Sequence, residues 1–135
     1  MTDDLETLAE FMDGSYYSAK DQNQKLMGFL CFGKNAQVPG GVKAEAYSNK
    51  QLTDLGIGMN PKFTGRVLEE AFIQEAIEFG REQLQIRGYR LSVAEFNLRA
   101  IKVYERVGFE KKQVFENREA KNKTNFVLME KSNNF

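Results

Sequence analysis

The chain of 135 residues contains no histidine. Without an imidazole, a Ser-His-Asp triad and a Cys-His pair are both impossible, and most zinc sites lose a usual ligand. We therefore expect no metal in the functional site. The single cysteine, Cys31, lies in the apolar run LMGFLCF. It excludes an internal disulfide and indicates a reducing compartment, and its burial preference favours a structural thiol over a nucleophile.

Long apolar runs and an excess of one charge are also missing. No run approaches the roughly 20 residues of a membrane-spanning helix, and the N-terminal MTDDLETLAE is acidic, unlike a signal peptide. Lysine plus arginine number 19, as do aspartate plus glutamate, so the net charge is zero. Nothing in this balance suggests a basic surface for nucleic acid. We predict a cytoplasmic protein that binds neither nucleic acid nor membranes.

What is present fits a single domain over residues 1–135, with 41% hydrophobic residues to build a core. The pattern predicts a helix over 2–13, strands over 15–21 and 25–33, a loop over 34–51, a strand over 51–60, a helix over 65–85, a strand over 89–96, a helix over 97–108, and strands over 109–117 and 124–131. This order indicates an α+β domain, in which helices flank a mixed, mostly antiparallel sheet of about six strands.

The stretch LGIGMNPKFTGRVLEEAF has the order strand, turn, helix. In that arrangement, free backbone N–H groups at the helix start can meet an anion, although most such turns bind nothing. Val67 adds bulk where a phosphate would approach, and Glu69 and Glu70 add negative charge to the first turn. Arg66 fits two roles equally well, a phosphate ligand and a solvated surface arginine.

The stretch LSVAEFNLRAIKVYERVGF closely resembles the acetyl-CoA-binding half of the GNAT superfamily of N-acetyltransferases. The residues that carry the likeness are Val93, Asn97, Ala100, Ile101, Tyr104, Gly108 and Phe109. The resemblance covers roughly residues 14–131 and implies the GNAT (acyl-CoA N-acyltransferase) fold. It further implies transfer of acetyl from acetyl-CoA, the cosubstrate, to a primary amine of a small molecule or peptide by direct attack. In this family the strand before Asn97 splays from its neighbour and leaves a V-shaped gap for the pantetheine arm.

The resemblance also implies roles for particular residues. Tyr104 is the expected general acid toward the thiolate, and a phenol is indeed protonated at neutral pH. The residues expected to bind the cofactor are Ile57, Met59, Thr64, Gly65, Arg66, Val67, Leu68, Asn97, Ala100 and Tyr104. Simpler roles stay open, with Asn97 as a helix cap and Tyr104 as a core residue.

A base is also needed to take a proton from the incoming ammonium. The candidates are Asp54 on the predicted strand over 51–60 and Glu45 just before it. Each also fits a solvated surface carboxylate, which is the commoner role of such residues.

Two departures from the family pattern weaken the expectation of activity. The family's phosphate turn reads Gln/Arg-x-x-Gly-x-Gly/Ala, whereas this chain places Thr64, Val67 and Glu69 at the basic and small positions. The family's first strand and helix are missing, which suggests either a shortened chain or an exposed sheet edge that pairs in a homodimer. The alternative function is therefore an impaired or inactive GNAT-fold module that binds CoA weakly or serves as an interaction domain.

Overall fold

A computed structural model describes residues 16–21, 23–60, 62, 66–118 and 123–132. The elements are β1 (Tyr16–Lys20), β2 (Leu26–Phe32), the 3-10 helix η2 (Lys34–Ala36), α1 (Pro39–Lys43), β3 (Thr53–Met59), α2 (Arg66–Gln83), β4 (Gly88–Ala94), α3 (Leu98–Val107), β5 (Glu110–Asn117) and β6 (Thr124–Ser132). The predicted strands and the two longer helices are confirmed, with small shifts at their ends. The helix predicted over residues 2–13 lies outside the described residues.

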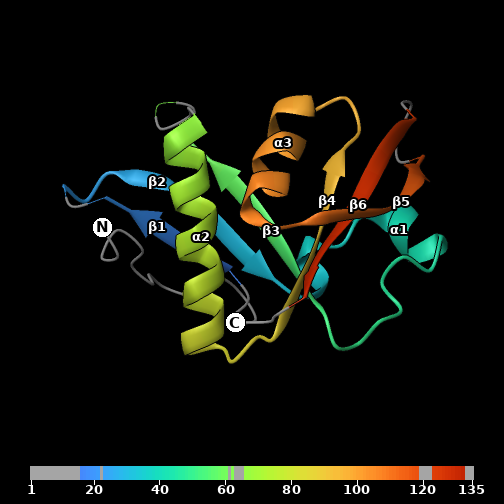
Figure 1. Cartoon of the computed structure of the whole chain (residues 1–135), viewed down its shortest axis with the longest axis horizontal. Helices are drawn as coiled ribbons and strands as arrows, with labels where there is room; N and C mark the ends of the chain where they lie inside the picture. The colour runs from blue at the N-terminus through green and yellow to red at the C-terminus, as the bar shows by residue number, and fades with distance from the viewer. Residues whose placement is uncertain (1–15, 22, 61, 63–65, 119–122, 133–135) are drawn as a thin grey trace.

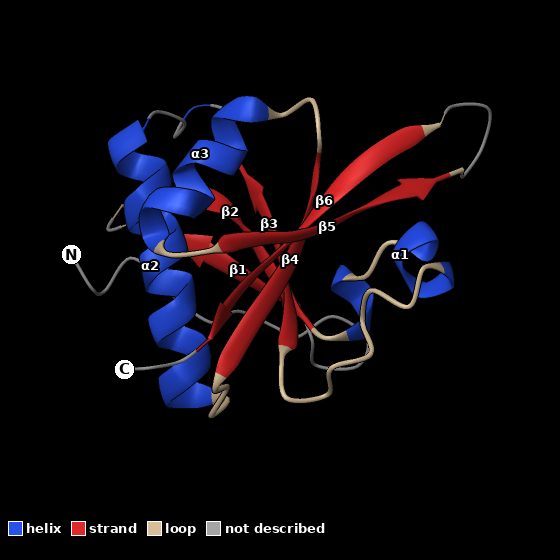
Figure 2. Ribbon diagram, turned by 45° about the vertical axis from the view of Figure 1, so that its right-hand side comes forward, coloured by secondary structure: helices blue, strands red, loops and turns tan. Residues whose placement is uncertain are grey.

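The six strands form one sheet in the order β1-β2-β3-β4-β6-β5. Neighbouring strands pair in antiparallel fashion, except that β3 and β4 are parallel. Helices α2 and α3 pack on one face of the sheet, and α1 lies on the other (Figures 1 and 2). This architecture confirms the predicted mixed, mostly antiparallel α+β fold. Among the described strands, β1 forms one edge of the sheet. The predicted pairing of such an edge in a homodimer stays a prediction.

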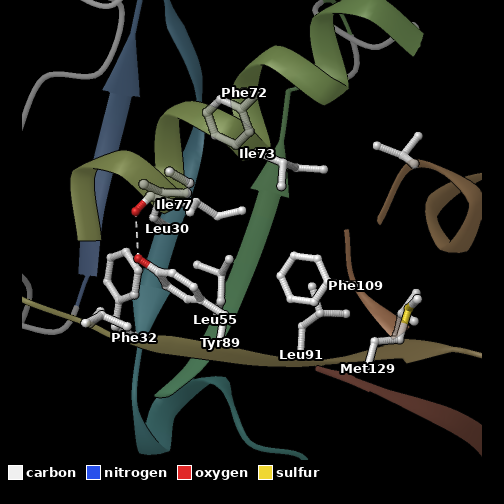
Figure 3. Close-up of a cluster of buried hydrophobic side chains, with 14 of the residues drawn as sticks. Leu30, Phe32, Leu55, Phe72, Ile73, Ile77, Tyr89, Leu91, Phe109 and Met129 are labelled. Carbon is white, nitrogen blue, oxygen red and sulfur yellow. Dashed lines mark hydrogen bonds between the residues drawn. The ribbon is translucent and has the colours of Figure 1, made fainter. Parts of the chain in front are cut away.

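The main core lies between the sheet and the helices α2 and α3. Helix α2 presents Phe72, Ile73 and Ile77 toward apolar side chains of the central strands (Figure 3). The hydroxyl of Tyr89 donates a hydrogen bond of 2.7 Å to the Ile77 carbonyl oxygen, so the buried phenol is satisfied. A Cβ at Gly80 would lie 2.1 Å from the same hydroxyl, which explains a glycine inside this helix.

The ends of α3 match the residues that predicted them. The Asn97 side chain accepts a hydrogen bond from the Ala100 backbone N–H at 3.2 Å, which satisfies one of the free donors at the helix start. Gly108 follows the helix in the left-handed region, with φ 115, and its N–H bonds to the carbonyls of Tyr104 and Glu105. This cap turns the chain directly into β5 and fixes Phe109 in the core.

The prediction of an unstructured loop over residues 34–51 is wrong in part, because η2 and α1 lie within it. Pro39 occupies the first turn of α1, where its missing N–H costs no hydrogen bond. Gly40 lets the helix start pack directly on β5, and its N–H donates to the Asn117 side-chain oxygen at 2.9 Å. The Pro-Gly-Gly sequence therefore begins a helix that is held by contact with a distant strand.

The same segment builds a second, smaller core on the sheet face opposite α2 and α3. Ala46 and Tyr47 are buried there against Phe115 and Leu128 of the last hairpin. Among the described residues, no helix is long and apolar enough to cross a membrane.

The close approach of Gly40 to β5 predicts an effect on stability. A Cβ at this position would lie 2.2 Å from the Glu116 carbonyl oxygen, so we expect Gly40→Ala to cost about 1–3 kcal/mol. The matched control is Gly58→Ala, since nothing lies within 4 Å of a Cβ there. Urea unfolding of both variants measures the difference, and equal stabilities would contradict the packing of α1 on β5.

Candidate functional site

The two central strands separate shortly after they begin. β3 and β4 share only the pairings of Thr53 with Tyr89 and Asp54 with Arg90. Beyond them, β3 stays paired with β2 as far as Met59, and β4 stays paired with β6 as far as Ala94. The strands therefore diverge toward their carboxyl ends, as Figure 1 shows. A splay of the strand before Asn97 is the geometry that the family resemblance implies.

A cavity of about 160 Å³ lies beside the diverging end of β3. Its walls are Ile57 and Met59 of β3, Glu69, Phe72 and Ile73 of α2, and Arg99, Ala100, Val103 and Tyr104 of α3. The lining is mostly apolar, with three polar side chains. Since sites for whole ligands are usually about 300–1,000 Å³, this cavity suits a slender part of a larger molecule.

Tyr104 of α3 lines the cavity. It packs edge-on against Phe109, with ring centroids 5.9 Å apart. Burial, and to a smaller extent the charge of Glu69, raises the pKa of Tyr104 to about 12. The phenol is therefore protonated at neutral pH and has a proton to donate.

Two ion pairs join the first turn of α2 to α3. Glu69, which is only 8% exposed, pairs with Arg99, and Glu70 pairs with Arg106 at 2.5 Å. The sequence raised the concern that both carboxylates would repel an anion at the helix start. In the structure each is balanced by an arginine, although Glu69 still lines the cavity. Sequence reasoning missed these pairs because the partners are about 30 residues apart in the chain.

The other predicted cofactor residues are only partly brought together. Ile57, Met59, Ala100 and Tyr104 meet in the cavity. Asn97 caps α3 and is exposed, and Leu68 is 44% exposed on the first turn of α2. Arg66 and Val67 begin α2, whereas Thr64 and Gly65 lie outside the described residues.

Asp54, one candidate base, is buried in an ion pair away from the cavity. Its two carboxylate oxygens accept hydrogen bonds from Arg90 at 2.7 and 2.8 Å, and Gln37 donates to one of them at 2.8 Å. The bond to Asp54 raises the pKa of Arg90. Because side chains alternate along a strand, Asp54 lies on the face opposite Ile57. The other candidate, Glu45, is exposed after α1. The geometry favours a role for Asp54 in joining the strands.

The single cysteine, Cys31, is not among the residues that line the cavity. Cys31 is half-buried, and burial raises the pKa of its thiol. Within the described part of the chain, no three His, Cys, Asp or Glu side chains gather in a way that would hold a metal ion.

The surroundings of Tyr104 predict a pH titration that NMR of ¹³Cζ-labelled tyrosine can follow. Tyr104 should titrate near 12, and Glu69→Gln should lower this pKa by removing a nearby negative charge. Glu70→Gln, which removes the neighbouring carboxylate instead, should leave it unchanged. Because the folded pKa exceeds the ordinary value of about 10, the stability that burial of the neutral phenol provides is complete below pH 10 and is lost as the pH rises toward 12. Titration of Tyr104 at 10 in the unmodified protein would contradict this picture.

Comparison with known proteins identifies the fold independently of this geometry. Among solved structures, a protein provisionally named phosphinothricin N-acetyltransferase superposes with a TM-score of 0.69 at 16% identity, covering 92% of this chain and 75% of its own. A GNAT-family acetyltransferase from Bacillus anthracis gives 0.67 at 14%, covering 90% and 68%. A variant of spermidine N-acetyltransferase from Vibrio cholerae gives 0.65 at 18%, covering 89% and 67%.

At these identities the likeness to solved structures establishes the fold alone. No curated protein matches the chain. A family model described as "Acetyltransferase (GNAT) family" matches residues 1–109, well over half of the sequence. The chain therefore belongs to the GNAT family of acetyltransferases.

Proposed function

We propose that this protein transfers an acetyl group from acetyl-CoA to a primary amine. One observation carries the proposal: two diverging strands lie beside a narrow apolar cavity that contains a protonated phenol. The divergence provides an opening for a thin ligand, the cavity provides an apolar wall, and Tyr104 provides an acid. Family membership supports acetyl transfer as the general activity.

The walls of the cavity suit the pantetheine arm of CoA, which is slender and carries two amides. Ile57 and Met59 would line one side of this arm, and Ala100 and Val103 the other. Beyond Asp54, the side of β3 that faces β4 has no pairing with that strand. Its backbone N–H and C=O groups are therefore available to the amides of a ligand. We assign cofactor binding chiefly to these elements, with the turn at 64–68 and Asn97 as further predicted contacts.

In the proposed reaction an amine nitrogen attacks the thioester carbonyl carbon directly. The new C–N bond forms, the C–S bond breaks, and the sulfur leaves as a thiolate. Tyr104 donates its phenolic proton to this thiolate, and the proton that nitrogen loses on amide formation balances the one that Tyr104 gives up. The first proton of the incoming ammonium passes to water, since Asp54 is engaged by Arg90. Glu45 remains the alternative acceptor of that proton.

A second function is favoured by one specific observation. Glu69 places a buried carboxylate on the cavity wall, near the helix start where the diphosphate of CoA is expected. A negative charge there opposes a diphosphate, even though Arg99 balances it. The alternative is a GNAT-fold module that binds CoA weakly or not at all and serves as an interaction domain.

A titration with acetyl-CoA separates the two functions. If the enzyme binds at low-micromolar levels, its melting temperature should rise with ligand concentration, and the gain should reach about 2.7 kcal/mol at 100 times the Kd. Adenosine diphosphate, which lacks the pantetheine arm, serves as the control and should give a smaller shift. If millimolar acetyl-CoA does not change the melting temperature, the proposed acetyltransferase activity is wrong and the interaction module is the remaining function.

Removing the acid tests the chemistry itself. We expect Tyr104→Phe to lower kcat by about 10²–10⁴-fold, because the thiolate then leaves without a proton donor. The Kd of acetyl-CoA should change little, since the ring and its packing against Phe109 remain. Acetyl-CoA consumption would be followed with polyamines first, given the likeness to a spermidine N-acetyltransferase, and then with amino acids and peptides. An unchanged kcat would rule out Tyr104 as the acid.

A further inference from the structure

The point at which β3 and β4 part is marked by a buried ion pair. Asp54 and Arg90 form the last pairing between the two strands, and the two residues are 3% and 2% exposed. The guanidinium holds the carboxylate in a two-point contact, with Nε–Oδ1 at 2.7 Å and Nη2–Oδ2 at 2.8 Å. Such a contact fixes the relative orientation of two groups as well as their distance.

The segment between β2 and β3 braces this pair. Gln37 donates to Asp54 Oδ2 at 2.8 Å, and the Asn49 carbonyl oxygen accepts from Arg90 Nη1 at 3.0 Å. The ring of Tyr47 lies under the guanidinium, with 5.1 Å between Arg90 Cζ and the ring centroid. Residues that belong to neither strand therefore contact both charged groups of the ion pair.

Tyr47 also contacts the part of β4 that diverges from β3. The Tyr47 hydroxyl lies 2.6 Å from Ser92 Oγ and accepts a hydrogen bond from the Val38 N–H at 3.0 Å. Ser92 is two residues beyond Arg90, so it belongs to the stretch of β4 that no longer pairs with β3. One polar network therefore contacts the junction and the strand that leaves it.

Stability alone is a weak reason for such a network. Replacing a buried ion pair with apolar residues of similar volume is often neutral or stabilising. The geometry points to a different role. We propose that Asp54 and Arg90, held by Gln37 and Tyr47, are positioning residues that set the angle at which β3 and β4 diverge. This angle sets the width of the opening between the two strands, where the pantetheine arm would bind. The effect on acetyl-CoA rests on the proposed function, whereas the effect on the strands does not.

The test uses a variant that removes the pair without leaving a buried charge. Asp54→Leu combined with Arg90→Met should fold, because the two apolar side chains replace the ion pair. If the pair positions the strands, the Kd of acetyl-CoA should rise about tenfold to hundredfold despite normal stability. The matched control is Glu78→Gln, which breaks the half-exposed pair with Arg81 on α2, outside the cavity lining, and should leave the Kd unchanged.

A distance measurement separates this proposal from the proposed function. Spin labels at Gly58→Cys and Glu95→Cys, in a Cys31→Ala background, report the separation of the diverging ends by pulsed electron resonance. The double variant should shift or broaden this distance distribution, and Glu78→Gln should not. If the double variant fails to fold, Gln37→Leu, which removes one brace and creates no buried charge, should produce a smaller change in the same direction.

Each outcome decides one point. An unchanged distance distribution in the folded variants would overturn the positioning role. A changed distance distribution with an unchanged Kd of acetyl-CoA would show that the ion pair positions the strands but does not affect cofactor binding. If the unmodified protein shows no binding of acetyl-CoA, the proposed function fails, and the distance measurement alone decides the role of the pair.

Discussion

Two residue pairs form the whole ladder between the halves of the sheet. Thr53 with Tyr89 and Asp54 with Arg90 are all that joins β1-β2-β3 to β4-β6-β5 through strand pairing. A longer ladder would close the sheet and abolish the opening beside Ile57 and Met59. A shorter one would leave the halves held only by the core beneath α2. The candidate site thus depends on the parallel pairing of β3 with β4 ending after two residue pairs.

The chemistry of the site follows from how the helices cover that opening. α2 and α3 supply mostly apolar walls, and the partial burial of Tyr104 between them raises the pKa of its phenol. The same two helices are joined at their polar rims by Glu69 with Arg99 and Glu70 with Arg106. One arrangement therefore places both a protonated phenol and a carboxylate on the wall of the cavity. The two proposed functions, acetyl transfer and a binding module, depend on opposite contributions of these two groups.

Much of the fold could be predicted from local sequence. The alternation of apolar residues identified the strands, and Asn97 and Gly108 marked the ends of α3 because capping chemistry is local. The segment over 34–51 was misjudged because α1 depends on contact between Gly40 and β5, which no local pattern encodes. Nonlocal pairing likewise hid the partners of Asp54 and Glu69. The sequence could name these carboxylates but could not show which arginine each one meets.

The parting of β3 and β4 has a consequence for how the protein meets other chains. It creates free strand edges in the middle of a sheet, and free edges normally invite aggregation. Here the edges of β3 and β4 meet at the pairing of Asp54 with Arg90 and diverge from there. A strand inserted between them would need a constant spacing of about 4.7–4.9 Å from each neighbour. No polypeptide can therefore run the length of both edges in register. A strand added from another chain could therefore pair with only one of the two edges along its length.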